Sequence, residues 1–193
     1  MPTVILFDVS LSMCKNVNLL DTNEVYSVKS LAVYGLNFLI DYISNNTKLE
    51  FISLMLFSSL WERNISFTRD FESIRTALNN LESFYDKTNI INALKGVQEL
   101  VLEEWGTNIP CNILLITDGN PGISAYSDLE NLEKFIFRFS FPAHLHIINL
   151  CSLNDSFTNH SLAYFKKIIE FTALNKEANL GELRLKMRLF LNK

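Results

Sequence analysis

The chain has 193 residues, of which 48% are hydrophobic and 20% are charged, and its formal net charge is −4. This is the composition of an ordinary globular protein, and the length leaves room for one sizeable domain. The acidic balance excludes an overall basic surface of the kind that binds nucleic acid. Basic side chains gather only near the end of the sequence, so we predict a domain over residues 1–175 and a basic helical tail over residues 176–193.

The first predicted elements are a buried strand and a long helix. Residues 3–8 are almost continuously apolar, which predicts a strand. Asp21, followed three residues later by Glu24, is typical of a helix N-terminus. Apolar residues then recur at steps of three and four, and this spacing predicts one helix that runs to about Asn45.

A pair of strands and a second helix come next. Residues 49–57 form an apolar run that predicts a buried strand. Residues 61–68 predict an antiparallel edge strand, since charged residues there can face water. Asp70 predicts the N-cap of a helix that ends near Leu81.

The rest of the chain alternates between strands and helices in the same way. Predicted strands are residues 111–117 and 145–151, and predicted helices are residues 88–105, 129–141 and 161–174. No β-branched run follows residue 172, so we expect no further strand in the sheet. Buried strands alternating with amphipathic helices predict an α/β fold: a doubly wound, mainly parallel sheet flanked by helices, with one antiparallel edge strand.

Three oxygen-bearing side chains stand at the end of the first strand. Asp8, Ser10 and Ser12 occupy alternate positions there. Open α/β sheets hold their ligands at the carboxyl ends of strands. Alternate residues of an extended loop share a face, so we expect both hydroxyls to point the same way as the Asp8 carboxylate. One carboxylate and two hydroxyls are hard oxygen donors of the kind that suits Mg²⁺.

Two further positions complete this pattern. Thr88 precedes a predicted helix, and Asp118 follows a predicted strand. With Asp8, Ser10 and Ser12 they resemble the metal-ion-dependent adhesion site of von Willebrand factor A domains. The resemblance implies the Rossmann-like A-domain fold, a Mg²⁺ ion held at these five positions, and one coordination position open to a carboxylate of a binding partner. It does not identify the surface that the partner contacts.

Each of these residues also has an ordinary structural explanation. Asp8 and Asp118 could cap turns or helix starts, and Thr88 could be the N-cap of the helix that follows it. Serines such as Ser10 and Ser12 are common in loops. The five residues point to a metal site through their joint occurrence in separate segments and not through any single member.

A Mg²⁺-dependent phosphohydrolase is the enzyme alternative, because such enzymes also place an aspartate after the first strand. An enzyme of the haloacid dehalogenase type needs a second aspartate two residues further on as its general acid. Ser10 occupies that position. The sequence also has no phosphate-binding glycine loop and no nucleophile elbow. We therefore expect a non-catalytic protein with no catalytic residues.

The cysteines and histidines form no zinc-binding pattern. Cys14, Cys111 and Cys151 have no metal-ligand spacing, and their number suits a reducing compartment. His144 and His146 alternate along one strand but lack further ligands. No signal peptide precedes the first strand, and the apolar runs are too short to cross a membrane, so we expect an intracellular protein.

Further stretches narrow the resemblance within the A-domain family to a subunit of the Integrator complex. These stretches are Lys48–Phe51, Leu56–Glu62, Phe67–Asp70, Tyr85–Thr88 and Thr117–Gly119. The resemblance implies a nuclear scaffold in an assembly that processes small nuclear RNA 3′ ends and attenuates transcription. Its expected partners are other Integrator subunits, namely subunits 10, 13 and 15, with nucleic acid contacted only indirectly and no membrane contact.

The same resemblance implies a β-barrel and a helical region after the A domain, and neither pattern occurs in these 193 residues. The alternative within the family is another intracellular A-domain scaffold, of a transcription or proteasome assembly.

Overall fold

The computed structural model describes residues 1–18, 24–47, 49–83, 87–118, 139–150 and 168–169. Several predictions from sequence lie outside these ranges. They are the N-cap at Asp21, the body of the helix at residues 129–141, most of the helix at residues 161–174, the tail at residues 176–193, and Cys151.

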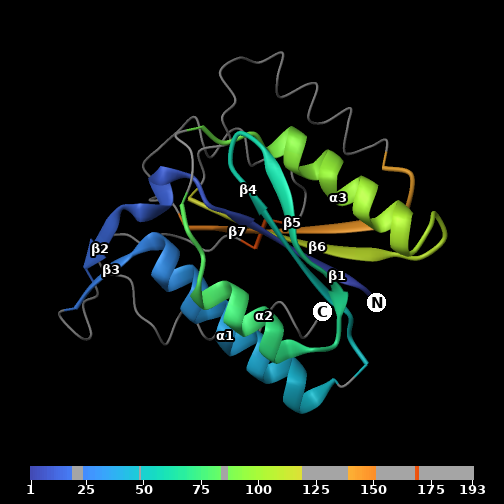
Figure 1. Ribbon diagram of the computed structural model, residues 1–193, viewed down its shortest axis with the longest axis horizontal. Coiled ribbons are helices and arrows are strands. Elements are labelled where there is room, and N and C mark those ends of the chain that lie inside the picture. The colour runs from blue at the N-terminus through green and yellow to red at the C-terminus, as the bar shows by residue number, and fades with distance from the viewer. Residues whose placement is uncertain (19–23, 48, 84–86, 119–138, 151–167, 170–193) are drawn as a thin grey trace.

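One twisted sheet carries the fold, and its central strand is the first in the chain (Figure 1). The strand order is β5-β4-β1-β6-β7-β8, and every neighbouring pair is parallel except β4 with β5. The predicted doubly wound sheet with one antiparallel edge strand is confirmed. The strands are β1 Thr3–Asp8, β4 Ile52–Phe57, β5 Trp61–Thr68, β6 Cys111–Thr117, β7 Ala143–Asn149 and β8 Ile168–Ile169.

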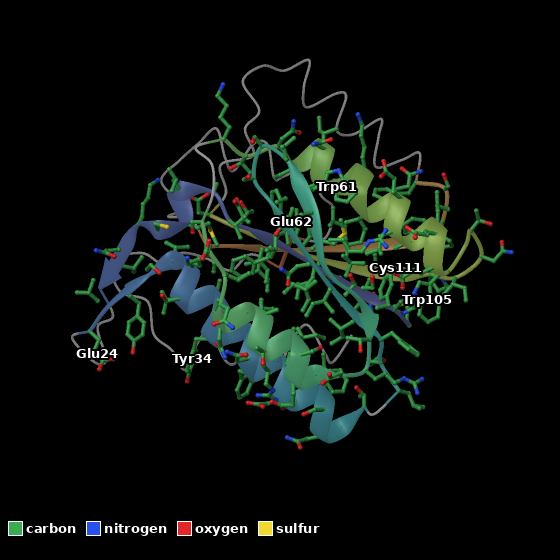
Figure 2. All side chains as sticks on the ribbon, viewed as in Figure 1. Glu24, Tyr34, Trp61, Glu62, Trp105 and Cys111 are labelled. Atoms are coloured by element: carbon green, nitrogen blue, oxygen red, sulfur yellow. The ribbon has the colours of Figure 1, made fainter. Side chains whose placement is uncertain are left out.

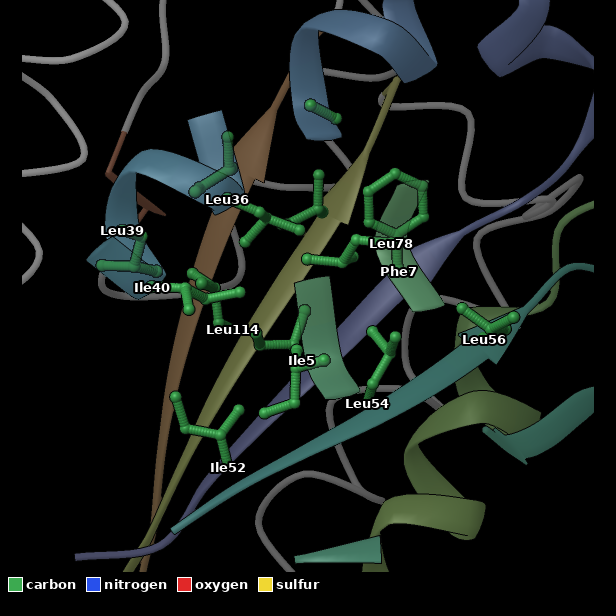
Figure 3. Packing of buried hydrophobic residues seen from close by; sticks show 14 of the residues in the cluster. Ile5, Phe7, Leu36, Leu39, Ile40, Ile52, Leu54, Leu56, Leu78 and Leu114 are labelled. Carbon is green, nitrogen blue, oxygen red and sulfur yellow. The ribbon is translucent and has the colours of Figure 1, made fainter. Parts of the chain in front are cut away.

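Helices cover both faces of the sheet, and each face has its own apolar core. Helices α1 (Val28–Asn46) and α2 (Phe71–Asn79) pack on one face, and α3 (Ile90–Glu104) packs on the other (Figure 1). Because successive strand residues point to opposite faces, β1 divides its side chains between the two cores. Ile5 and Phe7 face α1 and α2, where Figure 3 shows them among leucines and isoleucines of α1, β4 and β6. Val4 and Leu6 face α3.

Of the predicted starts of the first two helices, that of α1 is wrong and that of α2 is confirmed. Helix α1 begins at Val28 and not near Asp21, because residues 25–27 form strand β3 (Val25–Ser27), which pairs antiparallel with β2 (Asn16–Asn18). Val25 and Tyr26 suit a strand, and Ser27 is the N-cap of α1, its hydroxyl accepting the Ser30 N–H at 3.0 Å. The N-cap at Asp70 is confirmed, since its carboxylate accepts the Ser73 N–H at 3.2 Å.

The sheet also extends further than the sequence suggested. Ile168 and Ile169, which were expected inside a helix, form the short strand β8 and pair in parallel with Ile147 and Ile148 of β7. A β-branched pair beside an open sheet edge favours a strand over a helix. The expected helix is therefore wrong at these two residues, and the sheet gains a strand beyond β7.

Helix α3 approaches β5 closely at Gly96, which packs against the ring of Trp61. Figure 2 labels Trp61, the first residue of β5. A Cβ atom at position 96 would stand only 2.6 Å from Trp61 Cε2, so any larger residue there requires the indole to move. The close packing of the edge strand on α3 therefore depends on a glycine in a helix, where glycine itself is unfavourable.

We predict that Gly96→Ala destabilises the protein, because overpacking costs about 1–3 kcal/mol and exceeds the gain of about 1 kcal/mol in helix propensity. In a Trp61→Val background the sign should reverse, since only the propensity gain is left. Urea unfolding of the four members of this cycle measures both effects, with Glu99→Ala on the exposed side of α3 as the control. Equal effects of Gly96→Ala in both backgrounds would contradict the packing argument.

Candidate metal centre

The Asp8 carboxylate lies at the carboxyl end of the central strand and is fully buried. Asp8 stands opposite Phe57 at the end of β4, and the next residue, Val9, donates its N–H to the Phe57 carbonyl at 2.8 Å. The end of β1 is thus held in register by its neighbour. A carboxylate in such a place is costly unless it is hydrogen-bonded or paired with a cation.

Two donors from different parts of the chain hold this carboxylate. The Ser10 N–H donates to Asp8 Oδ1 at 2.9 Å, and the Thr117 hydroxyl donates to Asp8 Oδ2 at 2.7 Å. The first bond closes a turn, as one structural explanation of Asp8 anticipated. Sequence reasoning assigned Thr117 no role, although the signal was present: it is the polar last residue of an apolar strand that pairs with β1.

Burial governs the acidity of Asp8. Removal from water raises the pKa of Asp8 from its ordinary value of 3.8 to about 6, while the hydrogen bonds from Ser10 and Thr117 act in the opposite direction. The neighbouring Asp118 carboxylate adds a smaller repulsion that also raises this pKa. Two carboxylates close enough to repel each other would both gain from a cation between them.

Ser10 and Ser12 bring two hydroxyls together, but not in the way we expected. The loop does not stay extended: Leu11–Cys14 form a single turn of 3₁₀ helix, η1. Ser10 is its N-cap residue, yet the Ser10 side chain makes no capping bond. Instead the Ser10 and Ser12 hydroxyl oxygens lie 2.9 Å apart, with Ser10 fully buried and Ser12 partly so.

This separation fits a small divalent ion. Adjacent ligands of an octahedral Mg²⁺ ion lie at 2.0–2.1 Å from the metal, which places them about 2.9 Å from each other. The Ser10 and Ser12 oxygens are 2.9 Å apart already. The two hydroxyls could therefore occupy neighbouring positions around Mg²⁺ with little rearrangement.

Thr88 is not the N-cap of α3, so the ordinary structural explanation of this residue is wrong. Asn89 has that role: its side-chain oxygen accepts the Asn92 N–H at 3.0 Å. The Asn89 N–H in turn donates to the Ser58 carbonyl at 2.8 Å, and Ser58 directly follows β4. This bond brings Thr88, which is 6% exposed, to the same edge of the sheet as Asp8.

Asp118 completes the set of candidate ligands. It directly follows β6, beside β1, and is 7% exposed. Within the described ranges, no three histidine, cysteine, aspartate or glutamate side chains gather as a metal cluster. A metal centre at this edge would thus rest on two carboxylates, Asp8 and Asp118, together with hydroxyl oxygens and water, which suits Mg²⁺ better than zinc.

The described cysteines and histidines form no part of this candidate site. Cys111 is buried in β6 (Figure 2), and this burial raises its pKa to about 12. Cys14 is exposed. His144 and His146 lie on β7, with His144 exposed and His146 partly buried. No described helix has the length and apolar character needed to cross a membrane.

Comparison with known proteins agrees with this architecture. The chain is 41% identical to Integrator complex subunit 14 of Xenopus tropicalis and 40% identical to that of Homo sapiens, in each case over 88% of this chain and 34% of the relative. It therefore spans about a third of the length of these relatives.

A von Willebrand factor type A structure from Catenulispora acidiphila superposes with a TM-score of 0.65 at 14% identity, over 98% of this chain and 41% of that one. At that identity the superposition supports the fold alone. The family model of the von Willebrand factor type A domain matches residues 3–120. The chain belongs to the von Willebrand factor type A domain family.

Proposed function

We propose that this chain is a non-catalytic interaction domain that acts as a scaffold in a nuclear Integrator complex. The observation that carries the proposal is about 40% identity to Integrator complex subunit 14 along 88% of the chain. The proposed partners are other Integrator subunits, with subunits 10, 13 and 15 the expected ones.

We further propose that Asp8, Ser10, Ser12, Thr88 and Asp118 hold a Mg²⁺ ion. The support is the buried Asp8 carboxylate, the Asp118 carboxylate that repels it, and two hydroxyls at the spacing of an octahedral edge. When bound, the ion would supply a Lewis-acidic position for an oxygen ligand from a partner. The chain's own residues would hold the ion at the sheet edge, and their packing keeps bulk water from Asp8.

The position beside Asp8 where a phosphohydrolase has its general acid carries no acidic side chain. A phosphohydrolase would need a general acid beside Asp8, and the side chain two residues on is the Ser10 hydroxyl, which pairs with Ser12. Another A-domain scaffold, of a transcription or proteasome assembly, is the alternative within the family, and the sequence identity to Integrator subunit 14 favours the Integrator.

We predict that the tagged chain recovers Integrator subunits from nuclear extract in Mg²⁺. Asp8→Asn keeps the shape of the side chain and removes its charge, so recovery should fall at least several-fold if the metal supports the contact. Glu99→Ala removes an exposed carboxylate from α3 and should behave as the parent chain. Quantitative mass spectrometry of the captured proteins measures the difference.

The outcomes of this capture separate the two parts of the proposal. Equal recovery by the parent and Asp8→Asn would retain the scaffold and make the metal dispensable for it. Failure of all three folded chains to recover any Integrator subunit would contradict the scaffold itself.

The acidity of Asp8 gives a second prediction, for the metal-free protein. Its pKa rises from 3.8 in the unfolded chain to about 6 in the folded one, so the folded state holds the proton more tightly. Stability is therefore lost as the pH rises from about 4 to above 6. The amide of the variant Asp8→Asn does not titrate, and in EDTA at pH 8 this variant should be more stable than the parent by on the order of 3 kcal/mol.

Denaturant unfolding at pH 4 and pH 8 tests this prediction, because groups other than Asp8 titrate equally in both chains. The advantage of Asp8→Asn should vanish at pH 4. Millimolar Mg²⁺ should stabilise the parent and leave Asp8→Asn unchanged. A variant less stable than the parent at pH 8 in EDTA would contradict the raised pKa of Asp8, because the two hydrogen bonds from Ser10 and Thr117 would then outweigh the cost of its burial.

A further inference from the structure

Thr117 is not one of the predicted metal ligands, yet it holds the Asp8 carboxylate in place. Its hydroxyl donates to Asp8 Oδ2 at 2.7 Å, a short bond to a fully buried acceptor. Thr117 is itself fully buried. Such a bond is formed without competition from bulk water, so it constrains the orientation of the carboxylate strongly.

The backbone that carries the Thr117 hydroxyl is itself fixed. Thr117 ends strand β6 and pairs with Asn149 at the end of β7. Its carbonyl also accepts the N–H of Leu150 at 2.8 Å. Position 117 is therefore held by the neighbouring strand on the side away from Asp8, and the hydroxyl is a rigid donor.

The other Asp8 oxygen, Oδ1, is held by a donor that is close to Asp8 in the sequence. Oδ1 accepts the N–H of Ser10, in the loop that carries both serine hydroxyls. With one donor on β6 and one on its own loop, the carboxylate cannot turn about its Cβ–Cγ bond without breaking a hydrogen bond. Loss of the Thr117 hydroxyl would leave that rotation restrained by Ser10 alone.

This restraint affects cations unequally. Mg²⁺ demands near-ideal octahedral geometry and gains most from ligands that are already in place. Ca²⁺ accepts longer bonds, higher coordination numbers and carboxylates that chelate through both oxygens. The affinity for Ca²⁺ should therefore fall less than the affinity for Mg²⁺ when the carboxylate is free to turn. Residues that orient a metal ligand typically change affinity by 10–100-fold when they are removed.

We propose that Thr117 is a positioning residue that gives the site its preference for Mg²⁺ over Ca²⁺ by locking the orientation of Asp8. This inference rests on the proposed metal site and adds to it a residue outside the ligand set. It concerns selectivity between ions and does not require that the ion be used in partner binding.

The test is titration of the 193-residue chain with MgCl₂ and with CaCl₂ by isothermal calorimetry, in the parent, Thr117→Val and Thr117→Ser. Valine keeps the shape of threonine in a buried strand and removes the donor, whereas serine keeps the donor. Thr117→Val should weaken Mg²⁺ binding about tenfold or more and Ca²⁺ binding less. The ratio of the two affinities should fall in Thr117→Val and stay near the parent value in Thr117→Ser.

A purely structural role for Thr117 predicts a different pattern. In that case Thr117→Val would lower thermal stability in EDTA and would weaken the binding of Mg²⁺ and Ca²⁺ by the same factor. An unchanged ratio of the Mg²⁺ and Ca²⁺ affinities in Thr117→Val would therefore overturn the inference while leaving the metal site intact. A folded parent chain that binds no Mg²⁺ would overturn the metal site and the inference together. If circular dichroism shows that Thr117→Val does not fold, Thr117→Ala replaces it, because alanine removes the same donor with a smaller side chain. The same fall in the ratio of the Mg²⁺ and Ca²⁺ affinities is then expected of Thr117→Ala.

Discussion

The Asp8 carboxylate, buried without exposed area at the end of the central strand, is the constraint on which the rest of this account depends. Burial raises its pKa to about 6, so near neutral pH the metal-free chain holds a charge in a place that disfavours charge. Ser10 and Thr117 each donate one hydrogen bond to it, and those bonds only partly offset the loss of water. A nearby second carboxylate, on Asp118, adds to the same imbalance. A divalent cation is the simplest partner that removes it.

The topology explains why such a group lies at this edge. Strand β1 lies between β4 and β6, and the chain reaches these two neighbours by crossovers on opposite faces of the sheet, through α1 to β4 and through α3 to β6 (Figure 1). The carboxyl end of β1 is thus a point where the loops on its two sides diverge, and open α/β sheets bind ligands at such points. The two apolar cores hold β1 rigidly, so the position of Asp8 is set by packing on both faces. The polar loops need only supply the remaining oxygens.

Three strands of the main sheet were predicted with the right bounds, because burial and alternation act locally. The bounds of β1, β5 and β6 agree with the structure, and so does the cap at Asp70. The starts of helices were harder to predict from sequence. Several nearby residues can serve equally well as the N-cap, and hydrogen bonds to other segments of the chain decide among them. Helix α1 starts after Ser27 because residues 25–27 pair with β2, and Asn89 replaced Thr88 because its N–H is bound by Ser58. The role of Thr117 depends on a contact 109 positions distant in sequence, which no local pattern contains.

The central claim is that the end of β1 is built to hold a divalent cation, and the most direct measurement is a crystal structure of the chain grown with Mn²⁺. Manganese takes the same oxygen ligands as Mg²⁺ and gives an anomalous signal that locates it without bias. Our prediction is one strong anomalous peak among Asp8, Ser10, Ser12, Thr88 and Asp118, with the Thr117 hydroxyl still bound to Asp8. An ordered site with no peak there, at manganese concentrations of several millimolar, would contradict it.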